Sequence, residues 1–487
     1  MLLFVYPKKN RIVNRSPLSQ NEKQHLGRIC DYYERQTGTT KAAEHYREML
    51  SHYYNLLIPA TASILEVGCG SGGLLSRLHG SSKIGVDLSP AQIGHAKEKV
   101  PAGEFYVQAG EELSLPGKTF EYIVLSETLN LAVDVQLVLE RLRAVSTGQT
   151  RLIINVYNAL WRPWISLATA LGLRMRHPDS NWLSRDTLAG LLSLSGWELI
   201  RCESRILCPV KLFGLERFIN GLVAPFLSPF CLTLFVVARP IPDRISNEKS
   251  VSVVIPARNE AGNIEAAVAR TPTMGAWTEL IFVEGHSSDN TWETIQQIKG
   301  TYSGRPIKIL QQSGKGKGDA VRAGFAAAEG DVLMILDADL TVPPEELPKF
   351  YTAVVSGACE FANGSRLVYP MDEKAMQFLN LCANKTFGIL FSWLLGQPLK
   401  DTLCGTKVLT RENYQRIAEN RAYFGDFDPF GDFDLLFGAS KLNLKILDLP
   451  IRYRERVYGQ TNIQRWKHGW LLLQMLVFAA AKLKFVA

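Results

Sequence analysis

The stretch Gly330-Asp-Val-Leu-Met-Ile-Leu-Asp-Ala-Asp-Leu340 decides the fold of the second half of the chain. Its centre is a short apolar run of the kind that forms a buried strand, and it ends in the carboxylates of Asp337 and Asp339. Two carboxylates one residue apart at a strand end can both reach one hard divalent cation. The stretch therefore predicts a strand that delivers a metal site, with Asp337 and Asp339 as ligands.

Three polar loops come before this site along the chain. They are Pro256-Ala-Arg-Asn-Glu260, Glu284-Gly-His-Ser-Ser-Asp289 and Gly314-Lys-Gly-Lys-Gly318, the last of which precedes a helix predicted from Asp319. A second helix is predicted to open at Thr291. Strand-like and helix-like stretches alternate throughout both halves, which predicts parallel sheets with such loops at the strand ends.

The residue types in these loops predict a site for a nucleotide-diphospho-sugar. A cation on the two carboxylates would bridge the diphosphate and neutralise the leaving group, and Lys315 and Lys317 would add positive charge there. Glu284 is placed to accept a hydrogen bond from a base edge, while Arg258 and Glu260 are placed to line the nucleotide. The donor-binding residues expected here are Pro256, Ala257, Arg258, Glu260, Glu284, Asp289, Lys317, Asp337 and Ala338.

A Gly-rich turn marks the first half of the chain. Ser63-Ile-Leu-Glu-Val-Gly-Cys-Gly-Ser-Gly-Gly73 is a short apolar strand ending in glycines that let the backbone approach a ligand without Cβ clashes. Lys83-Ile-Gly-Val-Asp-Leu-Ser89 is predicted to be the next strand, and its Asp87 is placed to accept hydrogen bonds from a ribose diol. A Gly-rich turn alone is weak, because many nucleotide-binding folds have one.

A Pro-rich polar stretch, Arg239-Pro-Ile-Pro-Asp-Arg-Ile-Ser-Asn-Glu-Lys249, separates the two halves and has the composition of a linker. We therefore expect a first domain over residues 1–240, a linker over 241–250, a second domain over 251–462 and a C-terminal amphipathic helix over 463–487. The 487 residues are 46% hydrophobic and 21% charged, which excludes a disordered chain. A net charge of +7 is too weak to indicate nucleic-acid binding, whereas anionic substrates or a membrane surface fit equally well.

The cysteines and apolar runs indicate the compartment. The 8 Cys contain no CxxC pair and no zinc-like spacing, which favours a reduced, cytosolic chain. The start of the sequence lacks a basic region before a long apolar core, so we expect no secretory signal. No apolar run reaches the about 18–20 residues that a spanning helix needs. We expect a cytoplasmic protein, peripheral at the cytoplasmic face of the membrane.

The first half resembles the class I S-adenosylmethionine-dependent methyltransferases. Their pattern of strand, E/D-x-G-x-G-x-G, helix, strand and acidic residue is met over about residues 53–238, and the resemblance implies a Rossmann-like fold. The family often has an acid near the adenine, but Gln108-Ala-Gly-Glu-Glu-Leu113 lacks it. Backbone groups of Ala109 and Gly110, or the side chain of Glu111, would serve instead. The expected cofactor-binding residues are Glu66, Gly68, Cys69, Gly70, Gly72, Asp87, Leu88, Gly110 and Glu111.

Two segments of this half have other expected roles. Residues 161–197 are expected to build the methyl-acceptor side, and within them Ser184 is the predicted N-cap of a helix. Glu127, His79 and His95 are not convincing catalysts. The apolar residues 212–230 would be a membrane-facing flap, a substrate-facing flap or a surface that packs on the other half, and the sequence leaves these open. A Rossmann-like domain that no longer binds cofactor is the alternative to an active methyltransferase.

The second half resembles the inverting GT-A glycosyltransferases, and among them the polyprenyl-phosphate (dolichyl-phosphate mannose-type) synthases. The resemblance covers about residues 250–462 and includes Gly364-Ser-Arg366, Asp401-Thr-Leu-Cys-Gly-Thr-Lys407 and Pro450-Ile-Arg-Tyr-Arg-Glu-Arg456. It implies that Arg366, Lys407 and Arg456 face phosphates of donor or acceptor. The family's catalytic acid is expected in Gly431-Asp-Phe-Asp-Leu435. Asp432 is the first candidate and Asp434 the second.

The acceptor of the sugar stays open. A hydroxyl acceptor needs a general base, whereas a polyprenyl phosphate, with a second pKa near ~6, is already ionised and needs basic residues more. The sequence offers both. Residues 465–484 are predicted to form a helix with basic, aromatic ends and an apolar centre, which would lie at a membrane interface or dock on the domain or on a partner copy. Residues 376–395 are a similar candidate.

The leading prediction is a bifunctional α/β enzyme of two domains, a methyltransferase fold and a GT-A fold. One half would transfer a sugar, with inversion and with Mg²⁺ or Mn²⁺, to a polyprenyl phosphate or glycan, and the other a methyl group from S-adenosylmethionine. The alternative is a glycosyltransferase for a soluble or glycan hydroxyl, with the first half an inactive scaffold.

Overall fold

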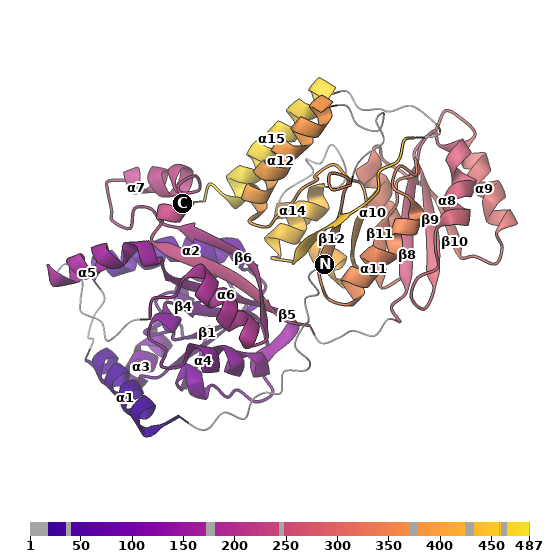
Figure 1. The fold of residues 1–487 in the computed structure, drawn as a ribbon. Helices are drawn as coiled ribbons and strands as arrows, with labels where there is room; N and C mark the ends of the chain where they lie inside the picture. The colour runs from indigo at the N-terminus through magenta and orange to yellow at the C-terminus, as the bar shows by residue number, and fades with distance from the viewer. Residues whose placement is uncertain are drawn as a thin grey trace. The chain divides into compact units, whose positions relative to one another are not determined.

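The computed structural model describes residues 18–35, 40–171, 181–242, 248–369, 378–423, 433–456, 458 and 465–486. The chain forms two compact units, Met1–Ile241 with Phe485–Ala487 (unit 1) and Pro242–Lys484 (unit 2). Each unit is built around a sheet of seven strands and is described by itself (Figure 1).

The sheet of unit 1 has the strand order β3-β2-β1-β4-β5-β7-β6. Pairing is parallel from β3 to β5, while β7 runs antiparallel to both of its neighbours. The parallel part places the carboxyl ends of β1, β2 and β4 at one edge, where the Gly-rich turn follows β1. The strands are β1 (Ser63–Val67), β2 (Ser82–Asp87), β3 (Glu104–Val107), β4 (Phe120–Ser126), β5 (Ser146–Tyr157), β6 (Trp197–Arg205) and β7 (Thr233–Pro240).

Helices cover both faces of this sheet, because successive strand residues point to opposite sides. Ile64 and Tyr122 pack in one apolar cluster with residues of α2 and α3, while their neighbours Leu65 and Ile123 pack in another with α4 and α6. Ser184 caps α6 by accepting from the backbone N–H of Thr187 at 3.2 Å, which confirms the predicted N-cap.

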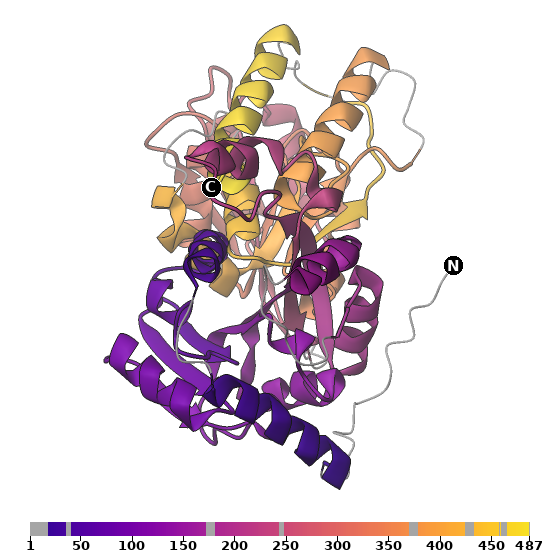
Figure 2. The ribbon, with the colours of Figure 1, turned by 90° about the vertical axis from the view of Figure 1, so that its left-hand side faces the viewer.

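The larger helices of unit 1 are α1 (Gln20–Glu34), α2 (Lys41–Leu57), α3 (Pro90–Lys99), α4 (Val135–Leu142), α5 (Arg162–Ala170), α6 (Arg185–Leu194) and the short α7 (Leu215–Phe218). Figure 2 shows α1, in the darkest indigo, as a straight helix along the edge of the unit, and it contacts α3. The helices α1 and α2 lie within the first domain expected over residues 1–240, and only the end of α2 falls within the stretch from about residue 53 that carries the methyltransferase resemblance.

The sheet of unit 2 has the order β10-β9-β8-β11-β13-β12-β14, in which β13 is antiparallel to β11 and β12 and the other pairs are parallel. The strand predicted from residues 330–340 is shorter than expected: β11 ends at Ile335, and Asp337 and Asp339 lie in the loop that follows. The strands are β8 (Val251–Ala257), β9 (Thr278–Glu284), β10 (Ile307–Gln311), β11 (Val332–Ile335), β12 (Phe361–Ser365), β13 (Lys407–Thr410) and β14 (Ile446–Pro450).

The helices of unit 2 include α9, which opens at Thr291 as predicted, and α10, which begins at Lys317 rather than at Asp319. The helices α12 and α15 contact each other (Figure 1). Among the described helices, none has the length and hydropathy required of a membrane span. The helices are α8 (Ile264–Arg270), α9 (Thr291–Thr301), α10 (Lys317–Ala327), α11 (Leu347–Val355), α12 (Phe378–Leu395), α13 (Arg411–Glu419), α14 (Phe433–Lys441) and α15 (Arg465–Leu483).

The predicted fold class is confirmed. Both units are α/β, each with a mostly parallel sheet whose strand-end loops carry the motifs that the sequence singled out.

Candidate functional sites

The Gly-rich turn after β1 requires glycine for two reasons. Gly68, Gly70 and Gly72 all have positive φ, at 77°, 50° and 71°, where a side chain is strained. A Cβ on Gly68 would also lie 2.5 Å from Oγ1 of Thr128, which donates a hydrogen bond to the carbonyl of Val67. The turn therefore packs closely against the residues that follow β4. Because its glycines have no side chains, its backbone can be approached by a ligand.

Asp87 fastens this turn to the next strand. At the end of β2, its Oδ2 accepts from the backbone N–H of Gly70 at 2.8 Å and its Oδ1 accepts from Ser89 at 3.0 Å. Burial raises the pKa of the carboxyl, against the opposing effect of these hydrogen bonds. The carboxylate retains acceptor capacity beyond two N–H groups, so it can also receive the hydroxyls of a ribose.

Glu66 has one buried oxygen without a partner in the described part of the chain. Its side chain is 2% exposed, and its Oε2 has no hydrogen-bond partner among the described residues. Burial, together with the charge of Asp87, raises the pKa of Glu66 to about 8, although the Arg47 guanidinium opposes this. A buried carboxyl without a partner is costly. An ammonium group, such as that of a methionine moiety, would satisfy it.

The side chain of Glu111 is already engaged. Its Oε1 accepts from the backbone N–H of Val133 at 2.8 Å and of Asp134 at 3.4 Å, so it fixes the loop before α4. Of the two alternatives for holding an adenine, the geometry therefore favours the backbone of Ala109 and Gly110, which lines the same space.

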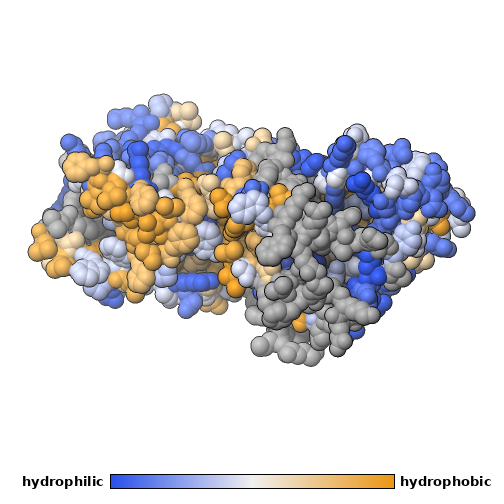
Figure 3. Space-filling view, turned by 90° about the horizontal axis from the view of Figure 1, so that it is seen from above, coloured by the Kyte–Doolittle hydropathy of each residue, from blue (hydrophilic) through white to orange (hydrophobic). Residues whose placement is uncertain are grey.

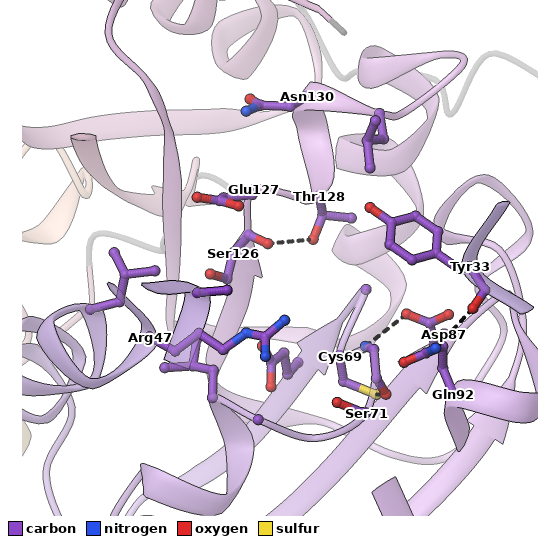
Figure 4. A pocket seen from close by; sticks show the side chains of 18 of the residues that line it. Tyr33, Arg47, Cys69, Ser71, Asp87, Gln92, Ser126, Glu127, Thr128 and Asn130 are labelled. Atoms are coloured by element: carbon purple, nitrogen blue, oxygen red, sulfur yellow. Dashed lines mark hydrogen bonds between the residues drawn. The ribbon is translucent and has the colours of Figure 1, made fainter. Parts of the chain in front are cut away.

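These groups surround one cavity of about 1070 Å³ in unit 1 (Figure 4). Gly72 is not on its wall, because it faces α3, where a Cβ would lie 3.3 Å from Cα of Ala96. The predicted cofactor residues that line the cavity are Glu66, Gly68, Cys69, Gly70, Asp87, Leu88, Gly110 and Glu111.

Several lining residues were missed by the sequence reasoning. Tyr33 of α1 and Arg47 of α2 lie on opposite sides of the cavity in Figure 4. The capping box of Ser19 and Glu22, which starts α1, was a sequence signal for this helix, which lies within the first domain expected over residues 1–240. Glu127, which was not expected to be a catalyst, lines the cavity and has a left-handed φ of 59°. Strained backbone of this kind clusters at functional sites.

In unit 2, the two carboxylates that follow β11 are each held by a basic side chain. Oδ1 of Asp337 lies 2.6 Å from Nζ of Lys317 on α10, and Oδ2 of Asp339 accepts from Nη2 of Arg456 at 2.6 Å. Burial would raise the pKa of Asp337, but Lys317, with Lys407 and Arg366 behind it, holds that pKa below its usual value. Both carboxylates thus lie beside basic side chains.

The loop after β8 joins the same cluster through Arg456. Its Nη1 lies 3.3 Å from Oε1 of Glu260, whose Oε2 accepts from Asn263 at 2.7 Å. Burial raises the pKa of Glu260. Pro256 and Ala257 end β8, with Ala257 buried, whereas Arg258 is exposed at the loop.

Two acidic residues that were expected to contact the nucleotide hold their own loops. Glu284 accepts from the backbone N–H of Ser287 at 2.5 Å, and Asp289 accepts from the N–H and the hydroxyl of Thr291 at the start of α9. Each carboxylate stabilises a loop at the edge of the sheet. A contact with a nucleotide base would have to use the acceptor positions that these hydrogen bonds leave open.

Arg366 has a partner that the sequence did not reveal. Its Nε and Nη2 donate to the two oxygens of Asp401 at 2.7 Å and 2.8 Å, and Asp401 is 0% exposed. The expected role of Arg366 as a phosphate ligand is weakened by this pairing, because much of its charge is neutralised. Lys407 is buried and donates to the carbonyl of Cys404.

The loop that carries Asp401 passes close to the carboxylate of Asp337. A Cβ on Gly405 would collide with the carboxylate of Asp337 and with Nζ of Lys317. Because this residue is a glycine, the loop can lie close to Asp337 and Lys317. No feature of the sequence predicted this close approach.

The candidate catalytic acids are placed only in part. Asp432 lies outside the described residues. Asp434, near the start of α14, accepts from Nε of Arg421 at 3.2 Å and lies 4.0 Å from Nη1 of Arg322. Among the described residues, no group of three or more His, Cys, Asp or Glu side chains could hold a metal. The pair Asp337 and Asp339 offers oxygen ligands of the type that Mg²⁺ or Mn²⁺ takes when substrate phosphates complete its shell.

Comparisons with known proteins separate the two units. Residues 42–201 match the family model of a methyltransferase domain, and residues 252–416 match that of glycosyl transferase family 2. The dolichol-phosphate mannosyltransferase of Pyrococcus furiosus is 40% identical over 224 residues, which is 44% of this chain and 59% of that protein. The chain therefore matches about three fifths of the length of this curated relative.

Two solved structures have low overall similarity. A S-adenosylmethionine-dependent methyltransferase from Thermotoga maritima, a possible histamine N-methyltransferase, covers 45% of this chain and 100% of its own, with a TM-score of 0.33 and 17% identity. Glucosyl-3-phosphoglycerate synthase from Mycobacterium tuberculosis, in complex with Mn²⁺ and UDP, covers 48% and 80%, with a TM-score of 0.36 and 20% identity.

Proposed function

The chain joins a methyltransferase domain to a family 2 glycosyl transferase domain, as its sequence patterns predicted, and we propose that it is an enzyme with two group-transfer reactions. Unit 1 transfers a methyl group from S-adenosylmethionine. Unit 2 transfers a sugar from a nucleotide-diphospho-sugar to a polyprenyl phosphate, with inversion at the sugar.

Methyl transfer is supported above all by the unsatisfied Glu66 beside the glycine turn. In the proposed complex, Asp87 accepts from the ribose hydroxyls, the backbone of Gly110 borders the adenine and Glu66 accepts from the ammonium. Bound S-adenosylmethionine supplies a methyl group on a positively charged sulfur. The residues of unit 1 need only orient it toward an acceptor, since positioning alone lowers the barrier of such a transfer.

Calorimetric titration of the full chain with S-adenosylmethionine tests this half. We expect saturable binding that Asp87→Ala weakens and that Glu112→Gln, a change at an exposed neighbour, leaves unchanged. A wild-type chain without binding heat, or one whose binding is indifferent to Asp87→Ala, would favour the alternative of an inactive scaffold domain.

Glycosyl transfer is supported by Asp337 and Asp339 beside Lys317 and Arg456. A divalent cation held by the two aspartates would neutralise the leaving diphosphate. An acceptor oxygen forms a bond to the anomeric carbon opposite the diphosphate, the bond from that carbon to the diphosphate breaks, and nucleoside diphosphate leaves. Attack from the opposite side inverts the configuration.

A polyprenyl phosphate is the acceptor that the charges favour. Such a phosphate is already ionised near neutral pH and needs no general base, and the candidate base Asp434 is engaged by Arg421. The name of the Pyrococcus furiosus relative agrees with this choice. A hydroxyl acceptor remains the alternative, with Asp432 as its general base.

Release of nucleoside diphosphate tests this half. Purified full chain is incubated with a panel of nucleotide sugars, Mn²⁺ and either a polyprenyl phosphate or a free glycan. We expect release only with the polyprenyl phosphate, its loss on addition of a chelator, and its loss in Asp339→Asn. Glu329→Gln, an exposed carboxylate before β11, is the matched control. Release by Asp339→Asn at the wild-type rate would contradict the assignment.

A further inference from the structure

An exposed apolar surface surrounds one side of unit 1. We call it the apolar rim and define it as residues 159–171, which contain α5, and residues 210–230, which contain α7. None of the residues of α5 is buried, and Trp164 is 64% exposed. In Figure 3, hydrophobic atoms, in orange, are concentrated in the left-hand part, where α7 lies in Figure 1.

The rim is costly in water. Phe213 is fully exposed, and its backbone has a left-handed φ of 51°. Phe218, Leu222 and Phe230 are exposed as well. Folding gains nothing from apolar side chains left in water, and a contiguous apolar patch on a soluble surface marks a site of interaction. The rim therefore serves binding rather than the stability of unit 1.

Hydrogen bonds join the two segments of the apolar rim. Trp161 donates its Nε1–H to the carbonyl of Phe230 at 2.8 Å, and Nδ2 of Asn158 donates to the carbonyls of Pro229 and Cys231, both at 2.9 Å. The segment before α5 is thereby tied to the end of the 210–230 segment, so both present their side chains together.

The charges on the rim have one sign. Arg162, Lys211 and Arg217 are exposed. Glu216 is turned inward, where it accepts from the backbone N–H groups of Leu212 at 2.8 Å and Gly214 at 2.9 Å. Aromatic and aliphatic side chains among exposed basic ones are complementary to a bilayer that contains anionic lipid, whose surface attracts each cation.

The rim is continuous with the cofactor cavity. Trp161, Trp164 and Ile165 beside and on α5, and Val210 at the start of the second segment, line the same cavity as Glu66 and Asp87. The lining of the cavity thus combines polar groups that suit the cofactor with apolar side chains of the rim.

We propose that the apolar rim docks on an anionic lipid bilayer, and that the methyl acceptor is an apolar molecule that enters the cavity from that bilayer. The second clause rests on the proposed methyl transfer of unit 1. A second copy of the chain is the competing occupant of the rim, and the experiment below separates the two.

Flotation of the full chain with vesicles tests the docking surface. Vesicles of phosphatidylcholine with phosphatidylglycerol should carry the wild type upward, and vesicles of phosphatidylcholine alone should carry much less, with the difference shrinking as salt is added. The double variant Phe213→Ser/Phe218→Ser should bind roughly tenfold or more weakly, since it removes two inserting rings. Leu194→Ser, which removes a 65% exposed leucine outside the rim, should bind as the wild type does.

Three results overturn the docking proposal. They are a wild type that stays below the vesicles, a double variant that floats as well as the wild type, and a double variant whose mass in light scattering falls from dimer to monomer. The last would show that a second copy covers the rim. Unchanged S-adenosylmethionine binding by the double variant shows that it is folded and keeps this result separate from any failure of the cofactor assignment.

The acceptor class is tested with tritiated S-adenosylmethionine and washed membranes of cells that express the protein. Label that partitions into the organic phase, and falls in the rim variant, supports an apolar acceptor. Label found only in the aqueous phase contradicts it. A chain that does not bind S-adenosylmethionine at all fails at the proposed function instead, while the flotation result still decides the docking surface.

Discussion

At the scale of single residues, Glu66 connects protonation to binding. The pKa of Glu66 in the folded chain is about 8, above its ordinary value of 4.5. Burial of the carboxyl raises this pKa, and the charge of Arg47 offsets the effect of burial only in part. The folded chain therefore holds a proton that the unfolded chain releases between these values. The stability that this provides is complete below pH 4.5 and is lost as the pH rises through 8.

We accordingly expect Glu66→Gln to stabilise unit 1 at pH 9, without S-adenosylmethionine, by roughly 3–5 kcal/mol relative to the wild type. The same variant should bind S-adenosylmethionine more weakly, because the ammonium loses a charged acceptor. Calorimetric melting between pH 5 and pH 9, with Glu112→Gln as control, measures the first effect. Parallel melting curves for wild type and Glu66→Gln across this range would refute it.

Gly405 is a second residue for which a prediction follows, because the structure leaves no room for a side chain at this position. We expect Gly405→Ala to abolish most release of nucleoside diphosphate, because its Cβ collides with Asp337 and Lys317 and must displace the proposed metal ligand Asp337. Gly300→Ala, at a helix position with nothing within 4 Å, is the matched control and should keep full activity. Activity of Gly405→Ala within twofold of the wild type would show that the loop is not held as close as described.

Much of this residue-level picture was predictable. The glycines and acids of both sites were identified by spacing, and they lie at strand ends because parallel strands bring their carboxyl ends to one edge. Which oxygen remains unsatisfied was not predictable. The orphaned Oε2 of Glu66 and the engaged oxygen of Glu111 depend on neighbours about 20 or more residues away.

At the scale of elements, the pair of Arg366 and Asp401 joins the end of β12 to the loop before β13. Burial would raise the pKa of Asp401, but the charge and the hydrogen bonds of Arg366 hold it below its usual value. The pair therefore stabilises unit 2 above the ordinary pKa of an aspartate, and this contribution is lost as the pH falls through the lowered one.

Breaking the ion pair of Arg366 and Asp401 should destabilise unit 2 strongly. We expect Asp401→Asn to lower the free energy of unfolding of unit 2 by about 3–5 kcal/mol, because a buried guanidinium is left without its counter-charge. Glu345→Gln breaks the ion pair with Arg270, which has similar geometry at the surface, and should cost at most about 1 kcal/mol. Urea unfolding measures both. Equal losses for the two variants would contradict the distinction between buried and exposed pairs.

At the scale of the whole molecule, two complete α/β units carry two sets of site residues. Each cluster lies at the strand ends of its own sheet and is built from residues of its own unit.

We therefore expect a double dissociation. Asp339→Asn should abolish release of nucleoside diphosphate and leave the affinity for S-adenosylmethionine within about twofold, because mutations at sites that share no partners act independently. Asp87→Ala should do the reverse. Assays of both reactions on each variant provide the measurement. Loss of both activities in either single variant would show that the two units function as one.

The sequence by itself determined the two α/β domains, the glycine turn and the paired aspartates, because these follow from local periodicity and spacing. Only the tertiary structure decided which groups meet: Arg366 with Asp401, Arg456 with Asp339, and helices α1 and α2 with the cofactor cavity. It also turned an ambiguous apolar segment into an exposed rim continuous with that cavity. The physical reason is that partners and burial depend on chain segments far apart in sequence, which no local pattern encodes.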